Sequence, residues 1–303
     1  MDRIPATPLT VAAGQAACVR LDTAANTATA AELLRRAADR GAELLVLPEL
    51  FLTGYELPAI SGDPDTHVIT PDDPRLDPLA EACAATRTAV VVGAPTRDQA
   101  SGDLRISALV LDRGGRLAAQ YDKQHVTPNE RLAGFTPGTD GCTLTLDGWT
   151  LGLGICWDLG FPEHARAAAL DGCHAYLVGA MLGQGSGTRE RAVRPPARAL
   201  DNTVYVLLAN HNGPSGPYVG CGGSAGWNPD GSLHTDAGSG TDPGLAVIRL
   251  DPDTLARVRS DEPVLTDPSL GPALRAAQDT GASTGDGTAE SVEGRPRIRT
   301  PLR

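Results

Sequence analysis

Short apolar runs alternate with amphipathic stretches between about residue 8 and residue 250. The runs predict buried strands because they are short, apolar and bounded by turn residues. They occupy residues 9–17, 42–49, 88–95, 149–158, 174–181 and 203–210. Amphipathic stretches at 29–41, 78–87 and 162–172 predict helices, of which the first and last end at Gly41 and Gly172. This alternation is typical of an α/β protein.

Antiparallel hairpins are predicted as well. Residues 104–123 alternate with period two around a Gly-Gly turn, and residues 218–234 and 244–251 form a second pair of apolar runs. Crossover strands and hairpins together indicate mixed sheets with helices on their outer faces. A further helix is expected near 196–202, beginning at Pro195 and Pro196, because proline suits the first turn of a helix and not its interior.

The chain is predicted to divide into a domain over 1–265 and a tail over 266–303. The tail is rich in Gly, Ser, Thr, Pro and charge, so it is expected to be flexible or packed on a partner chain.

Composition narrows the function classes. With 303 residues, 41% of them hydrophobic, the chain can bury a large core. A formal net charge of -11 and scattered arginines argue against binding nucleic acid or an anionic membrane. No apolar run is long enough to span a bilayer, and the first residues lack the pattern of a signal peptide, so a cytoplasmic protein is expected.

The six cysteines favour reduced thiols. No two of them form a CxxC pair, and no close-spaced Cys/His quartet suggests a zinc site. The cysteines therefore predict neither a disulfide framework nor a zinc site.

Lys123 is the only lysine among 26 basic residues. Lysine differs from arginine in being a compact charge on a flexible stem, whose pKa moves readily on burial. It follows a predicted strand, as do Glu49 and Cys156, and catalytic groups in α/β domains gather at such strand ends. Each residue alone is ordinary, but together they supply a base, a cation and a nucleophile.

At these residues the sequence resembles the nitrilase superfamily of carbon-nitrogen hydrolases. The matching stretches stand in the family's order over about residues 8–250. They are "LLVLPELFLTGYE", "YDKQHVTPNERLAGFTPG", "LGICWDLGFPEHAR", "ARALDNTVYVLLAN" and "YVGCGGSAGWNPDGSL". Asp201 departs from the family's usual glutamate, and the prolines at 195 and 196 interrupt an expected helix.

The resemblance implies a four-layer αββα sandwich and a catalytic triad of Glu49, Lys123 and Cys156. It also implies that Glu130 orients the lysine and that Trp157 supplies a main-chain N–H to the oxyanion. Glu49 would deprotonate Cys156, whose thiolate would attack a carbonyl carbon and form a thioester that water hydrolyses. No metal or organic cofactor is expected, because this mechanism requires none. The family further implies a homodimer or a larger homo-oligomer.

The residues after Cys156 favour a small neutral amide as substrate. "FPE" at 161–163 looks like the amidase branches, and Leu159 and Gly160 stand where carbamoyl-amino-acid hydrolases carry arginines. A nitrile or an N-carbamoyl substrate remains an alternative on the same triad. The candidate pocket residues are Tyr55, Trp157, Phe161, Met181, Gln184 and Tyr218.

Three rival interpretations are open. "GGSAG" at 222–226 matches the nucleophile elbow of serine hydrolases, with Ser224 and the later His234, although a turn rather than a helix is predicted after it. Cys156 and His164 form a conceivable Cys-His pair. The chain could also be a catalytically silent binding or scaffold protein of the same fold.

Overall fold

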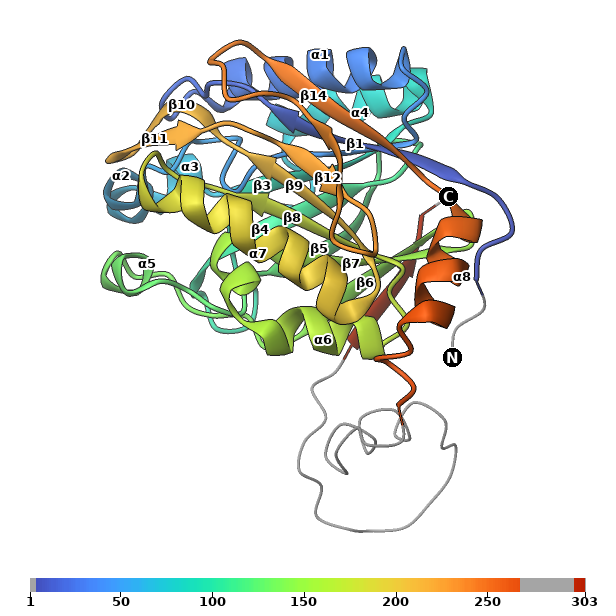
Figure 1. The fold of residues 1–303 in the computed structure, drawn as a ribbon. Coiled ribbons are helices and arrows are strands. Elements are labelled where there is room, and N and C mark those ends of the chain that lie inside the picture. The colour runs from blue at the N-terminus through green and yellow to red at the C-terminus, as the bar shows by residue number, and fades with distance from the viewer. Residues whose placement is uncertain (1–3, 268–296, 303) are drawn as a thin grey trace, which may run out of the picture.

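The computed structural model describes residues 4–267 and 297–302. Within them the chain forms two large mixed sheets that face each other, with helices outside both (Figure 1). The predicted four-layer αββα sandwich is confirmed.

The first sheet contains six strands in the order β14-β1-β2-β3-β4-β5. They are β1 (Leu9–Gln15), β2 (Leu44–Val46), β3 (Ala89–Arg97), β4 (Leu104–Leu111), β5 (Leu117–Asp122) and β14 (Gly244–Leu250). The central strands β1, β2 and β3 are parallel, whereas β4, β5 and β14 pair antiparallel with their neighbours. The hairpin predicted over 104–123 is β4 and β5.

The second sheet contains seven strands in the order β13-β12-β9-β8-β7-β6-β15. They are β6 (Gly141–Leu146), β7 (Trp149–Ile155), β8 (Ala175–Ala180), β9 (Tyr205–Asn210), β12 (Ala225–Trp227), β13 (Leu233–Asp236) and β15 (Arg297–Pro301). A separate hairpin joins β10 (Asn212–Ser215) to β11 (Tyr218–Cys221).

Helices cover the two outer faces. Helices α1 and α4 lie along the first sheet, and α6 and α7 lie along the second, on the opposite side of the molecule (Figure 1). The long helices are α1 (Thr23–Ala38), α4 (Asp77–Thr86), α6 (Pro162–Leu170), α7 (Ser186–Asn202) and α8 (Pro252–Asp261). Short helices are α2 (Leu57–Gly62), α3 (Pro64–His67), α5 (Pro128–Leu132), and the 3-10 turns η1 (Pro74–Leu76) and η2 (Cys156–Gly160). No helix among these described residues is both long and apolar enough to cross a membrane.

The core has two parts. Apolar side chains of both sheets, including Val11 and Trp149, fill the space between the sheets, and the same cluster extends through Tyr176 to helix α6 outside the second sheet. A second cluster, including Leu34 and Leu79, lies between the first sheet and its helices. Burying these side chains removes a large apolar area from water and holds the layers together.

Helix α7 corrects one prediction. It begins at Ser186, so Pro195 and Pro196 lie inside it rather than at its start. Tertiary contacts hold its first half, because the Arg191 Nε donates to Gly223 O at 2.7 Å and the Arg191 guanidinium stacks on Trp227. These contacts override the local preference of proline for a helix start.

The end of the chain adds a strand that the pattern did not predict. Strand β15 pairs in parallel with β6 of the same chain. Most of the predicted tail, residues 268–296, lies outside the described residues.

Candidate active site

The ends of three strands bring Glu49, Lys123 and Cys156 together. Glu49 follows β2, Lys123 follows β5 and Cys156 follows β7. The side chains of Glu49 and Lys123 have no exposed surface, and Cys156 is 8% exposed. Lys123 Nζ donates to Glu49 Oε1 at 2.6 Å and to Glu130 Oε1 at 2.5 Å. One buried cation is thus shared by two carboxylates.

Glu130 is fixed by its place in helix α5. Its main-chain N–H donates to Thr127 Oγ1 at 3.2 Å, while its Oε2 accepts the Thr127 N–H at 2.7 Å, which makes a capping box. The other oxygen, Oε1, accepts hydrogen bonds from Lys123 and from the Tyr55 hydroxyl. We call Glu49, Tyr55, Lys123 and Glu130 the lysine cluster.

Two glycines let the segment before Glu49 pass between the sheets. A Cβ on Gly93 of β3 would lie 2.3 Å from Pro48 O, and a Cβ on Gly179 of β8 would lie 2.6 Å from Leu47 O. Neither position has room for a side chain. The carbonyl of Glu49 accepts a hydrogen bond from His211 Nε2 at 2.6 Å, so the backbone of the carboxylate is held from both sheets.

The environment of Glu49 suits a base. Burial raises the pKa of this carboxyl to about 7, against the opposing effect of the Lys123 charge. Among the described residues no N–H or O–H group is bonded to Glu49 Oε2. The Cys156 thiol lies near this carboxyl, since its hydrogen bonding acts to lower the pKa of Glu49.

Burial acts in opposite directions on the pKa of Lys123 and the pKa of Cys156. Burial alone would lower the pKa of Lys123, but the negative charges of Glu49 and Glu130 outweigh it and hold the pKa above its usual value. Burial raises the pKa of the Cys156 thiol well above its usual value, and the Glu49 charge adds to this effect. The resting site therefore holds a charged lysine and a neutral thiol.

Cys156 stands at a sharp bend where β7 ends. Its φ of 45° lies in the left-handed region, which residues with a side chain rarely adopt. The bend begins the turn η2, which carries Trp157 next to the thiol, and a main-chain hydrogen bond from Met181 acts to lower the thiol pKa. The main-chain N–H of Met181 therefore approaches the sulfur.

The family model for the carbon-nitrogen hydrolases matches residues 10–260 of the chain. The chain belongs to the carbon-nitrogen hydrolase family. The family predicted from the motifs is confirmed.

Named relatives of this carbon-nitrogen hydrolase include bacterial enzymes. It is 34% identical over 251 residues to a protein of Pseudomonas protegens named hydrolase in pqqF 5'region, covering 82% of this chain and 84% of the other. It is 32% identical to an (R)-stereoselective amidase of a Pseudomonas species, covering 75% and 80%. A solved amidase from Nesterenkonia sp. superposes with a TM-score of 0.72 at 31% identity, covering 86% of this chain and 95% of the other. In a variant of that amidase, the acetamide moiety of fluoroacetamide is attached covalently to the active-site cysteine.

The predicted pocket residues of this carbon-nitrogen hydrolase occupy different places. Tyr55 is buried in the lysine cluster, and Tyr218 packs edge-on against it with ring centroids 5.8 Å apart. Met181 is buried beside the thiol. Phe161 stacks on His125, with the two ring centroids 3.8 Å apart, and Gln184 is exposed. Among the described interactions, neither side chain contacts Glu49, Lys123 or Cys156.

The residues of the rival hydrolase interpretations, Ser224, His234 and His164, have other surroundings than those interpretations require. Ser224 is buried ahead of strand β12, not a helix, and its Oγ accepts the Asn210 N–H at 2.9 Å. His234 is exposed and bonds to Asn228. Both ring nitrogens of His164 lie within hydrogen-bonding distance of hydroxyls, Tyr121 at 2.7 Å and Tyr176 at 2.8 Å, so this histidine is occupied away from Cys156.

Two residues that hold the site were not selected from the sequence. His211 supports the Glu49 backbone, and Ser215 Oγ accepts the Tyr55 N–H at 2.7 Å. Both lie more than a hundred residues along the chain from the residues they support, so no local pattern marks them.

One described group has the spacing of metal ligands. Side-chain ligand atoms of His125, Asp158 and His164 all lie within 4.8 Å of one another. Hydrogen bonds already engage these atoms, since Asp158 Oδ1 lies 2.8 Å from His125 Nδ1 and Tyr121 lies between Asp158 and His164. The absence of a cofactor stays a prediction.

Proposed function

We propose that this chain hydrolyses a small neutral amide, with Cys156 as nucleophile and Glu49 as general base. The observation that carries the proposal is a buried Glu49 carboxyl that the Cys156 thiol approaches and whose Oε2 has no N–H or O–H partner among the described residues. A carboxyl with a pKa of about 7 can both accept and return a proton near neutral pH.

Acylation follows from this arrangement. Glu49 takes the thiol proton while Cys156 Sγ attacks the carbonyl carbon of the amide. The Lys123 ammonium and the main-chain N–H of Trp157 stabilise the negative oxygen of the tetrahedral intermediate. Glu49 then gives the proton to the leaving nitrogen, the C–N bond breaks, and ammonia departs from a thioester on Cys156.

Deacylation uses the same groups in the reverse order. Glu49 takes a proton from water, whose oxygen attacks the thioester carbon. The C–S bond breaks, the thiol regains the proton, and the carboxylic acid leaves. Glu130 holds Lys123 in place through both steps, since it accepts the lysine N–H at 2.5 Å and is itself capped onto helix α5.

A cavity of about 740 Å³ beside Tyr55 supports a neutral substrate. Apolar side chains such as Leu57 and Pro58 line much of it, together with Tyr218. Arg20 is the one cation in its described lining, and this arginine is paired with Glu56 at 2.8 Å. A substrate carboxylate would have to compete with Glu56 for that charge.

A substrate panel with mass analysis tests this function. Purified protein is given butyramide, butyronitrile and N-carbamoylalanine, ammonia release is followed, and acid-quenched samples are weighed intact. We expect ammonia from butyramide and a mass increase of one butyryl group on Cys156. A Cys156→Ala variant should lose both signals, and Cys142→Ala, which removes a buried thiol elsewhere, should keep them.

The other outcomes separate the alternatives. Ammonia from butyronitrile and none from butyramide would make the chain a nitrilase, the name of a Pyrococcus abyssi relative that is 31% identical over 189 residues. Turnover of N-carbamoylalanine alone would make it a carbamoyl hydrolase. A folded protein whose Cys156 gains no mass with any substrate would support the silent scaffold.

We further propose that the chain forms a homodimer or a larger homo-oligomer. Helix α7 on the outer face exposes Val193 and Leu200, at 64% and 50%, and a second copy could cover them. Light scattering coupled to gel filtration measures the mass directly, and a monomer at micromolar concentration would refute this proposal.

A further inference from the structure

Asp158 lies two residues after Cys156 and is completely buried. Its Oδ2 accepts the Ile155 main-chain N–H at 2.9 Å and the Tyr121 hydroxyl at 2.7 Å. Its Oδ1 accepts the His125 main-chain N–H at 2.9 Å and lies 2.8 Å from His125 Nδ1. Each oxygen of this carboxylate thus has two partners.

These partners flank the catalytic residues in the chain. Tyr121 and His125 stand two residues before and two residues after Lys123, and Ile155 stands immediately before Cys156. One buried carboxylate therefore ties the segment of the lysine to the turn of the nucleophile.

The charge of Asp158 is kept in spite of burial. Burial acts to raise the pKa of this carboxyl, but His164, His125 and Tyr121 outweigh it and hold the pKa below its usual value. As a carboxylate, Asp158 can only accept, so Tyr121 donates its hydroxyl proton to it and accepts the N–H of His164 Nε2. We call Asp158, Tyr121, His125 and His164 the aspartate network.

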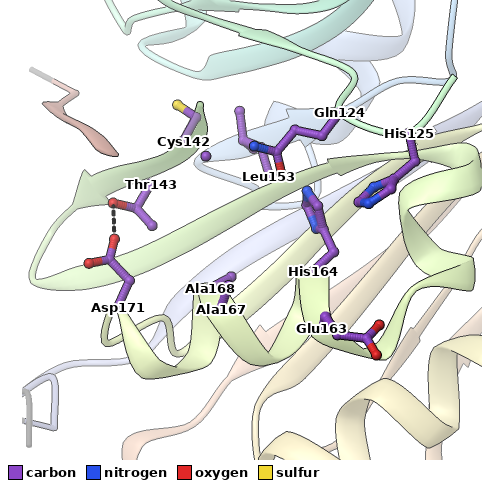
Figure 2. Close-up of a pocket in the computed structure, with 11 residues that line it drawn as sticks. Gln124, His125, Cys142, Thr143, Leu153, Glu163, His164, Ala167, Ala168 and Asp171 are labelled. Carbon is purple, nitrogen blue, oxygen red and sulfur yellow. Dashed lines mark hydrogen bonds between the residues drawn. The ribbon is translucent and has the colours of Figure 1, made fainter. Parts of the chain in front are cut away.

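A cavity of about 340 Å³ borders the outer side of this network. Figure 2 shows the rings of His125 and His164 close together at one end of the cavity, with Thr143 and Asp171 at the other. The histidines thus separate Asp158 from the cavity.

We infer that Asp158 is a positioning residue, which fixes the bend at Cys156 relative to Lys123. The bend needs such support, because Cys156 has a φ of 45° and the Ile155 N–H directly before it is held by Asp158. The inference rests on the proposed function for its effect on turnover, but its effect on thiol reactivity can be measured without any amide.

Asp158→Asn tests the inference with little change in shape. An amide has one acceptor oxygen and one NH₂ group, so in either orientation the NH₂ group faces a main-chain N–H, that of Ile155 or that of His125. Either the Ile155 contact or the His125 contact is then lost. The matched control is Asp112→Asn, since Asp112 is also buried and accepts main-chain N–H groups, from Gly114 at 2.8 Å and Arg116 at 3.0 Å, in the β4–β5 turn.

We expect Asp158→Asn to lower kcat about a hundredfold, with KM within about threefold of wild type, because misplaced catalytic groups slow the chemistry more than they weaken binding. The rate at which iodoacetamide alkylates Cys156 should change at least about tenfold. Asp112→Asn should leave kcat and the alkylation rate unchanged, even where its unfolding temperature falls equally.

Wild-type kcat and alkylation rate in folded Asp158→Asn would overturn the inference, as would an equal loss in Asp112→Asn. If Asp158→Asn does not fold, Tyr121→Phe decides, because it removes one of the four partners and keeps the main-chain contacts. A threefold to tenfold lower kcat, on the order of one lost hydrogen bond, would support the inference, and an unchanged kcat would overturn it. Wild-type protein that hydrolyses no amide would instead refute the proposed function, and the alkylation comparison would still test Asp158.

Discussion

The lysine cluster and the aspartate network are two buried polar groups that neighbour Cys156. They differ in how completely the hydrogen bonds of their carboxylates are satisfied. In the lysine cluster, Glu49 keeps one oxygen without an N–H or O–H partner. In the aspartate network, both oxygens of Asp158 are occupied twice. An unpaired buried carboxylate oxygen is costly in free energy, so its presence beside a thiol indicates reactivity, whereas full pairing indicates a scaffold.

The two groups also differ in charge. The lysine cluster places two carboxyls against one ammonium, and burial raises the pKa of Glu49 to about 7. Asp158 has its pKa held below the usual value by its partners. The pKa of one buried carboxyl is thus raised and the pKa of the other is lowered, although both neighbour the same cysteine.

The largest effect is expected for Glu49→Gln. Glutamine keeps the shape and one acceptor for Lys123 but cannot take the thiol proton, so kcat/KM should fall about a thousandfold. Steady-state kinetics on butyramide measure this. Glu43→Gln is the control, since Glu43 pairs with Arg113 away from the site. A loss of kcat/KM below about tenfold in Glu49→Gln would contradict the distinction between a reactive lysine cluster and a supporting aspartate network.

Lys123→Arg should lower kcat at least about a hundredfold with the fold retained. The lysine Nζ is wholly enclosed, with carboxylate oxygens at 2.6 Å and 2.5 Å, so a guanidinium would occupy the space that the substrate oxygen needs. Circular dichroism checks the fold, and kinetics check turnover. Near-normal turnover would show that the only lysine of the chain stands there by chance.

The pH dependence of kcat/KM should show a limb from Glu49. Since burial raises the pKa of this carboxyl to about 7, the group is protonated below that pH and cannot accept the thiol proton. We expect kcat/KM to rise with pH, about tenfold per unit, up to about pH 7 and then to level. A flat profile down to about pH 5 would place the base at its ordinary pKa and contradict the role of burial.

The smallest effect is expected for Tyr55→Phe, which removes one donor to Glu130 and leaves Lys123 bonded to both carboxylates. Loss of one hydrogen bond is worth about 1 kcal/mol, so kcat should fall about fivefold. Tyr205→Phe removes a hydroxyl contact with Asp251 outside the site and should leave kcat unchanged. A loss as large as that of Glu49→Gln would give Tyr55 a part in the chemistry itself.

Local pattern predicted the mixed sheets, the outer helices and the three strand ends, because buried strands and outer helices have distinct periods, whereas the four-layer sandwich was implied by the motif resemblance. The prediction that a helix begins at Pro195 and Pro196 was wrong. Helix α7 begins at Ser186, and contacts of Arg191 hold the half of the helix that precedes the prolines. Local pattern also missed β15, which exists through its pairing with β6.

The site shows the same division. Their places at predicted strand ends selected Glu49, Lys123 and Cys156, and the motif resemblance added Glu130. The structure brings these residues together, while their roles stay predictions. Asp158 was not selected, because the sequence does not reveal that Tyr121 and His125 donate hydrogen bonds to it.

Residues 47–49 pass between Gly93 and Gly179, and this has a consequence for the order of folding. These glycines belong to different sheets, and Glu49 meets Lys123 across a sequence separation of 74 residues. Neither sheet alone encloses the Glu49 carboxylate. Glu49, Lys123 and Cys156 therefore meet only after the two sheets have docked. During refolding, the return of turnover should therefore lag behind the return of helix and strand signals, which makes enzymatic activity a reporter of the final docking step.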